Sequence, residues 1–346
     1  MAYSRGLRTL LLNTLYSIMQ LPYTDRMISL KILQKAALIA LVLLIPTAII
    51  YKFASIHAVT IFILSFIISL KDFATLKPKQ SIILGVTIAI LLTAATFAGT
   101  DALWLPVLVG IAGLVSIYAN RTAGGIFGIA PAYVAVVGFL VTGGSHWVVL
   151  VFALLGFAYA FLVQHLTKIT FKHHAMNKRT ALQYGIFLAI TGAASTWISI
   201  QLSAPHPYWF VLAAIMVLHP KRVETFKVMW KRSLATIVGA FIAIAVLHFL
   251  PTPFIIVVAV IATTLFFCYL LLSKYFAQIT LITILLLLIL SIDAHDTGDD
   301  LSFARVWLTL AGTAFAAALY SIGILVMRFI DREASDTTVK RGGNKE

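Results

Sequence analysis

The sequence contains few charged residues and almost no cysteine. Only 11% of its 346 residues are charged, whereas soluble domains have roughly a quarter. In contrast, 61% of the residues are hydrophobic and the mean hydropathy is +1.00. The single cysteine, Cys268, excludes an intrachain disulfide and a cysteine-based metal cluster. This composition predicts an all-α membrane protein that crosses the lipid bilayer several times.

Acidic residues are missing from the interiors of the apolar stretches. All 12 Asp and Glu residues lie at the ends of apolar runs or between them. Proton-coupled carriers usually hold a buried carboxylate or histidine as a proton relay, so only histidines near span ends remain candidates here. No nucleophile–base pair, metal-ligand set or phosphate-binding loop ending in Lys-Ser/Thr stands out. The sequence therefore predicts neither an enzyme nor a cofactor or metal site.

Twelve apolar runs divide the chain into two sets of six. They lie at roughly 34–51, 56–70, 81–98, 102–118, 125–142, 146–167, 183–202, 207–219, 233–250, 253–272, 275–292 and 304–329. Several runs are shorter than the ~20 residues of a simple membrane span. We therefore expect about twelve transmembrane helices, some of them tilted, paired or re-entrant.

Basic residues predict the orientation of these helices. If the N-terminus is cytoplasmic, all but two of the 26 Lys and Arg residues, Lys52 and Arg305, fall on the cytoplasmic side. The longest outer loop, SIDAHDTGDDLS, contains four aspartates and no cation. This is the positive-inside pattern, and it predicts that both termini are cytoplasmic. It also accounts for the net charge of +14 without a nucleic-acid partner.

The two sets of six runs resemble each other. Leu33-Gln34 opens the first set as Leu182-Gln183 opens the second, and His57 and His206 occupy matching places. Six spans in each half predict parallel repeats, related by an axis along the membrane normal. The expected layout is an amphipathic cytoplasmic segment (1–30), a first membrane repeat (31–167), a basic linker (168–180), a second repeat (181–330) and a disordered tail (331–346).

A sequence motif lies in the second half. The string YW-x10-P-x4-T-x6-R-x3-T-x2-G is formed by Tyr208, Trp209, Pro220, Thr225, Arg232, Thr236 and Gly239. It resembles the signature of the fusaric acid resistance family, also called the aromatic acid exporter family. One position departs from the pattern, because Ala235 stands where the family usually has glycine. The resemblance implies an exporter of small, often aromatic, carboxylates in a bacterial inner membrane, and for some members a periplasmic adaptor protein.

The motif also indicates candidate binding residues. Arg232, Thr236 and Gly239 share one helix face, and a guanidinium can bind a carboxylate through two parallel hydrogen bonds. We expect them to form an anion site at the cytoplasmic mouth, although Arg232 could instead only anchor its helix to lipid phosphate. Tyr208 and Trp209 are expected to line the route, unless they belong to an interfacial aromatic belt.

Five further residues complete the predicted site. His206 and Arg305 are additional substrate-binding candidates, and Arg305 could instead pair with an aspartate of the outer loop. Pro207 suits the first turn of a helix. With Pro220 and Thr225 it is expected to have a structural role in the motif.

Three functions remain open from the sequence. The first is export of small organic, possibly aromatic, carboxylate anions from the cytoplasm. The second is channel-like conduction of organic anions. The third is a membrane module that assembles with or regulates partners without transporting anything. A periplasmic adaptor and further copies of the chain are conceivable partners.

Overall fold

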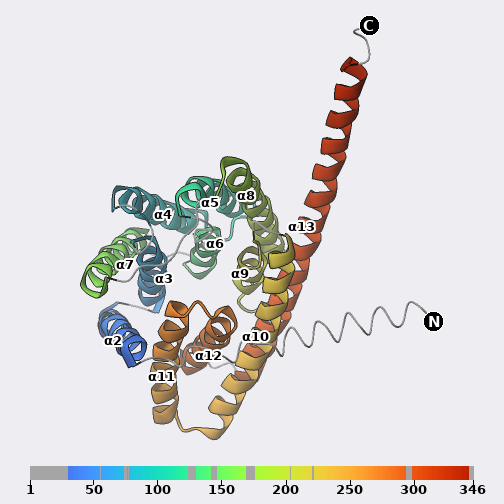
Figure 1. Cartoon of the computed structure of the whole chain (residues 1–346). Helices are drawn as coiled ribbons and strands as arrows, with labels where there is room; N and C mark the ends of the chain where they lie inside the picture. Colours follow the sequence, from blue (N-terminus) through green and yellow to red (C-terminus); the bar gives the residue numbers. More distant parts are fainter. Residues whose placement is uncertain are drawn as a thin grey trace, which may run out of the picture.

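The computed structural model describes residues 30–54, 56–73, 76, 78–123, 130–141, 146–168, 176–202, 204–219, 222–293 and 298–342. Within these residues there are twelve helices and no strand (Figure 1). The predicted amphipathic segment at residues 1–30 lies outside this part of the chain, apart from residue 30, and so does most of the basic linker.

The helices follow the order of the twelve apolar runs. They are α2 (Leu30–Phe53), α3 (Ile56–Phe73), α4 (Pro78–Ala98), α5 (Trp104–Ala123), α6 (Ala130–Leu140), α7 (His146–Thr167), α8 (Lys178–Gln201), α9 (Tyr208–Met216), α10 (Arg222–Phe249), α11 (Thr252–Leu271), α12 (Tyr275–Asp293) and α13 (Gly298–Gly342). Among the described residues, eight helices are long and apolar enough to cross a membrane, namely α2, α4, α5, α7, α8, α10, α11 and α13. The all-helical class is confirmed, and the number of twelve transmembrane helices stays a prediction.

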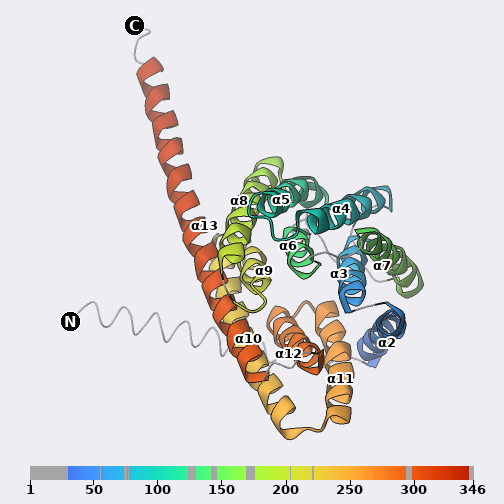
Figure 2. The ribbon, with the colours of Figure 1, turned by 180° about the vertical axis from the view of Figure 1, so that it is seen from behind.

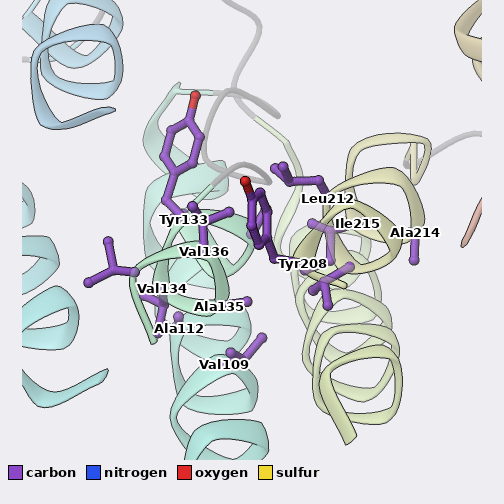
Figure 3. Close-up of a cluster of buried hydrophobic side chains, with 14 of the residues drawn as sticks. Val109, Ala112, Tyr133, Val134, Ala135, Val136, Tyr208, Leu212, Ala214 and Ile215 are labelled. Atoms are coloured by element: carbon purple, nitrogen blue, oxygen red, sulfur yellow. The ribbon is translucent and has the colours of Figure 1, made fainter. Parts of the chain in front are cut away.

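Two short helices, α6 and α9, lie inside the bundle (Figures 1 and 2). At 9 residues, α9 rises only ~14 Å, less than half of the ~30 Å hydrocarbon core. All residues from Tyr208 to Ile215 are buried, as are those from Ala130 to Gly138. A helix that is apolar on every side is stable only when other helices surround it. Figure 3 shows the side chains of α6 and α9 meeting in the core, with Tyr208 between the two helices.

Helix α13 is the longest element, with 45 residues. Its first part packs on α9 and α10, and its C-terminal part extends well beyond the bundle (Figures 1 and 2). The sequence predicted a disordered tail from residue 331, whereas α13 continues as a helix to Gly342.

The two halves of the chain make matching helix contacts. Helix α3 packs on α7 as α9 packs on α13, and α4 packs on α7 as α10 packs on α13. Two further contacts join the halves to each other. Helix α5 of the first half packs on α8 of the second, and in the matching contact α11 of the second half packs on α2 of the first. These pairings join segments that are far apart in the sequence.

Two glycines make the α3–α7 and α9–α13 contacts in the same way. A Cβ on Gly156 would lie 2.6 Å from the Phe62 carbonyl oxygen and 2.9 Å from the Ser65 Cβ. A Cβ on Gly312 would lie 2.4 Å from the Phe210 carbonyl oxygen and 3.0 Å from the Ala213 Cβ. In each case only the absence of a side chain lets the backbones approach this closely.

Candidate functional site

The start of the family-like motif positions α9. Pro207 precedes α9 with φ −62°, a value that the proline ring imposes and that suits the start of a helix. Its carbonyl oxygen accepts a hydrogen bond from the Ser199 hydroxyl of α8 at 2.8 Å. Helix α9 is therefore tied to α8 at its first turn.

Thr225 closes the turn between α9 and α10. Its hydroxyl accepts a hydrogen bond from the His219 backbone N–H and donates one to the His219 carbonyl, both at 3.0 Å. The Tyr184 hydroxyl donates to the neighbouring Leu218 carbonyl at 3.1 Å. These contacts hold the turn together, and the structural role of Thr225 stays a prediction; Pro220 lies outside the described residues.

Arg232 lies deep in α10. We expected it to open a span at the cytoplasmic mouth, but α10 begins at Arg222, which places Arg232 ~15 Å along the helix. Its side chain is 2% exposed, and Nη1 donates to the Met216 Sδ at 3.6 Å. The helix starts earlier than predicted because Lys227 and Lys231 occupy its exposed face, as the polar residues of an amphipathic helix do.

Arg305 is a second buried arginine, on α13. It is 2% exposed, and its guanidinium carbon lies 5.0 Å from the centre of the Trp209 ring. This distance is that of a cation–π interaction. His206 stacks on the same Trp209 ring at 4.9 Å, and its Nδ1 lies 3.2 Å from the Tyr208 hydroxyl. Arg305 and the three aromatic residues of the predicted site are thus adjacent.

The two arginines have no acidic partner in the part of the chain that the structure describes. No salt bridge to either is found there, and Arg232 Nε and Arg305 Nε and Nη1 are buried without a hydrogen-bond partner. Buried cations normally pair with a carboxylate, since removing an unpaired charge from water costs several kcal/mol. Within the described residues no carboxylate neutralises the charges of these two arginines.

Unpaired hydroxyl groups accompany the arginines. Thr236 on α10 is 1% exposed, as is Ser302 on α13, and Thr309 on α13 is fully buried. Their hydroxyl oxygens have no hydrogen-bond partner within the described residues. Thr236 is one of the residues predicted from the sequence, whereas Ser302 and Thr309 are not. Their spacing around Arg305, which places all three on one face of a helix, was the signal that could have found them.

Gly239 lies where α10 packs against α12. A Cβ added to it would lie 2.7 Å from the Thr280 carbonyl oxygen of α12. It therefore allows close packing of α10 on α12, as expected for a glycine that admits another backbone, and it faces a helix other than α9. In the described part of the chain no group of three or more metal-ligating side chains occurs.

Comparison with protein families places these residues in one domain. A family model described as fusaric acid resistance protein-like matches residues 188–319. This part of the chain is similar to that family. It includes α9, α10 and the part of α13 that holds Arg305. No curated protein and no solved structure matches the chain. The similarity of residues 188–319 to this family and the long apolar helices indicate a multi-pass membrane protein.

Proposed function

We propose that this protein exports small organic carboxylate anions, aromatic ones among them, from the cytoplasm across a bacterial inner membrane. The observation that carries the proposal is the pair of buried arginines, Arg232 and Arg305, without an acidic partner in the described residues. A bound carboxylate would supply the missing charge and would accept hydrogen bonds from the free guanidinium N–H groups. Trp209 and Tyr208 would offer apolar rings beside it.

We further propose that the halves are parallel repeats with both termini in the cytoplasm. The matched contacts of α3–α7 with α9–α13, and the exchanged contacts of α5–α8 with α2–α11, support the repeat. The accumulation of Lys and Arg on one side of the predicted spans supports the orientation. In this arrangement α9 runs from the outer side towards the cytoplasm, and α10 returns.

The proposed driving force is the membrane potential. The sequence places no carboxylate deep in a predicted span that could relay a proton. An inside-negative potential favours the exit of a monovalent anion by ~2.3 kcal/mol per 100 mV. Because a bound anion would lie beside two arginines that cannot lose their protons at working pH, recognition would need no change of protonation.

Flux through purified protein tests the proposal. Proteoliposomes loaded with radiolabelled benzoate and held at an inside-negative potassium diffusion potential should lose benzoate faster than protein-free vesicles, without a pH gradient. The flux should saturate with internal benzoate. Conduction that does not saturate would favour the channel-like alternative, for which the same arginines would attract anions. Flux that requires a proton gradient and ignores the potential would refute the electrogenic mechanism.

A further inference from the structure

A continuous polar face runs along the buried part of α13. Ser302, Arg305, Thr309 and Thr313 are separated by three, four and four residues, which places them on one side of the helix over ~16 Å. None of them is more than 2% exposed. The Thr313 hydroxyl lies 3.4 Å from the Ser233 hydroxyl of α10. We call these four residues the α13 polar face.

The direction of this face follows from its neighbours. Arg305 reaches Trp209 of α9, and Gly312, on the same side, is packed against the α9 backbone. Thr313 meets Ser233 of α10. The polar face is therefore directed between α9 and α10, where Arg232 is also buried.

The first half of the chain provides an internal comparison. Gly156 of α7 contacts α3 as Gly312 of α13 contacts α9, and the two glycines are 156 residues apart. The same spacing matches Arg305 with Val149, and Thr309 with Ala153, both of which are 1% exposed.

The two ends of the α13 polar face match His146 and Phe157 of α7. His146, the counterpart of Ser302, is polar, but its Nδ1 lies 2.7 Å from the Thr96 hydroxyl. Phe157, the counterpart of Thr313, is apolar and packs against Gly85 of α4. The face of α7 that matches the α13 polar face therefore consists of side chains that are apolar or hydrogen-bonded.

This comparison separates packing from function. A buried hydroxyl without a hydrogen bond costs ~1–3 kcal/mol, and Ala153 fills the position of α7 equivalent to Thr309 without that cost. The hydroxyl of Thr309 is thus not needed to pack a helix at this place, and the polar counterpart of Ser302, His146, has a hydrogen-bond partner that Ser302 lacks among the described residues. Hydroxyls can instead donate hydrogen bonds to an anion that has lost its hydration water.

We propose that the α13 polar face is the path along which the carboxylate crosses the protein, and that the matching face of α7 carries no anion. The proposal rests on the proposed function and names further residues of the same site. Arg305 supplies the charge, while Ser302 and Thr309 replace the water of the carboxylate on either side of it. Transport then depends on the second half of the chain, although both halves share one packing scheme.

Thr309→Val tests this proposal because it removes the hydroxyl and preserves the shape of the side chain. We expect saturable benzoate efflux to show Vmax/KM lowered ~10-fold, equivalent to ~1.4 kcal/mol. Thr309→Ser, which retains a hydroxyl, should recover most of the transport that Thr309→Val loses. Ala153→Ser introduces a hydroxyl at the counterpart position of α7 and should stay within ~3-fold of wild type.

A second measurement does not depend on flux. Benzoate that binds the native protein should raise its melting temperature in detergent, and Thr309→Val should weaken this shift while leaving the melting temperature without benzoate the same or higher. If the wild type shows neither flux nor a benzoate-dependent shift, the proposed function and this inference both fail. If the wild type shows them and Thr309→Val is unchanged, only this inference fails. A loss of transport in Ala153→Ser with normal melting would overturn the assignment of the path to α13 alone.

Discussion

Arg305→Met separates a functional cation from a structural one. Arg305 is 2% exposed, and no salt bridge to it is found within the described residues. Methionine fills a similar space, needs no hydration and adapts to irregular surroundings. If Arg305 is present to bind an anion, its removal should abolish transport and also make the empty protein more stable.

The size of the effect follows from opposing contributions. Replacing buried ionic groups by apolar side chains of similar volume stabilises proteins by up to ~1–4 kcal/mol. The substitution also removes one of the two buried cations, Arg232 and Arg305. Against this, it loses the interaction with the Trp209 ring at 5.0 Å, which contributes ~0.5–2 kcal/mol. We expect a net stabilisation of ~1–2 kcal/mol, which corresponds to a melting temperature raised by ~2–5 °C.

The assay compares melting and flux in the same preparations. Melting of the purified variants is followed by tryptophan fluorescence in detergent without added carboxylate, and benzoate efflux is measured in proteoliposomes. Arg121→Met is the control, because Arg121 is an exposed cation in the last turn of α5. Its melting temperature should change by less than ~2 °C, since surface substitutions usually act within ~0.5 kcal/mol, and its flux should be normal.

Two outcomes would refute this reasoning. A melting temperature lowered by several degrees in Arg305→Met would show that the guanidinium stabilises the fold, as in a satisfied buried network. Normal efflux in the same variant would show that the anion does not need this charge.

Three further predictions concern the motif, the helix packing and the topology. Arg232→Lys should insert normally and transport roughly tenfold more slowly, because lysine lacks the planar fork and one charge-assisted contact of ~1.4 kcal/mol is lost; full activity would make Arg232 a structural anchor. Gly312→Ala should destabilise by ~1–3 kcal/mol because its Cβ would meet the α9 backbone, whereas the Cβ of Gly110→Ala would find its nearest neighbour at an ordinary 3.7 Å and should be tolerated in the same melting assay. In a Cys268→Ala background, a cysteine at Thr297 should react with an impermeant thiol reagent from outside, and labelling only from the cytoplasm would invert the proposed orientation.

Much of the architecture could be predicted because it depends on local composition. In the part of the chain that the structure describes, the twelve apolar runs form twelve helices in the same order, since a stretch without charges must satisfy its backbone internally in an apolar environment. The spacing of Tyr208, Trp209 and Arg232 identified the part of the chain that matches the fusaric acid resistance protein-like family. Both kinds of information are contained in consecutive residues.

Helix lengths and the depth of the arginines could not be predicted in this way. The sequence predicted that Lys227 and Lys231 lie in a loop. In the structure they lie on the exposed face of α10, whose opposite face is buried. The sequence predicted that Arg305 lies on the outer side of the membrane, next to the aspartates of the outer loop. In the structure α13 packs against α9, and Arg305 is buried. Burial depends on which helices meet, and charge counts along the chain do not contain that information.

The sequence by itself determined the membrane class, the order of the helices and the motif, because hydropathy and residue spacing are properties of neighbouring residues. Only the tertiary structure decided that Arg232, Arg305 and Trp209 share one interior, and that Ser302 and Thr309 lie beside them without hydrogen-bond partners among the described residues. The physical reason is that these contacts join α9, α10 and α13, whose side chains are brought together by close packing at small residues such as Gly312.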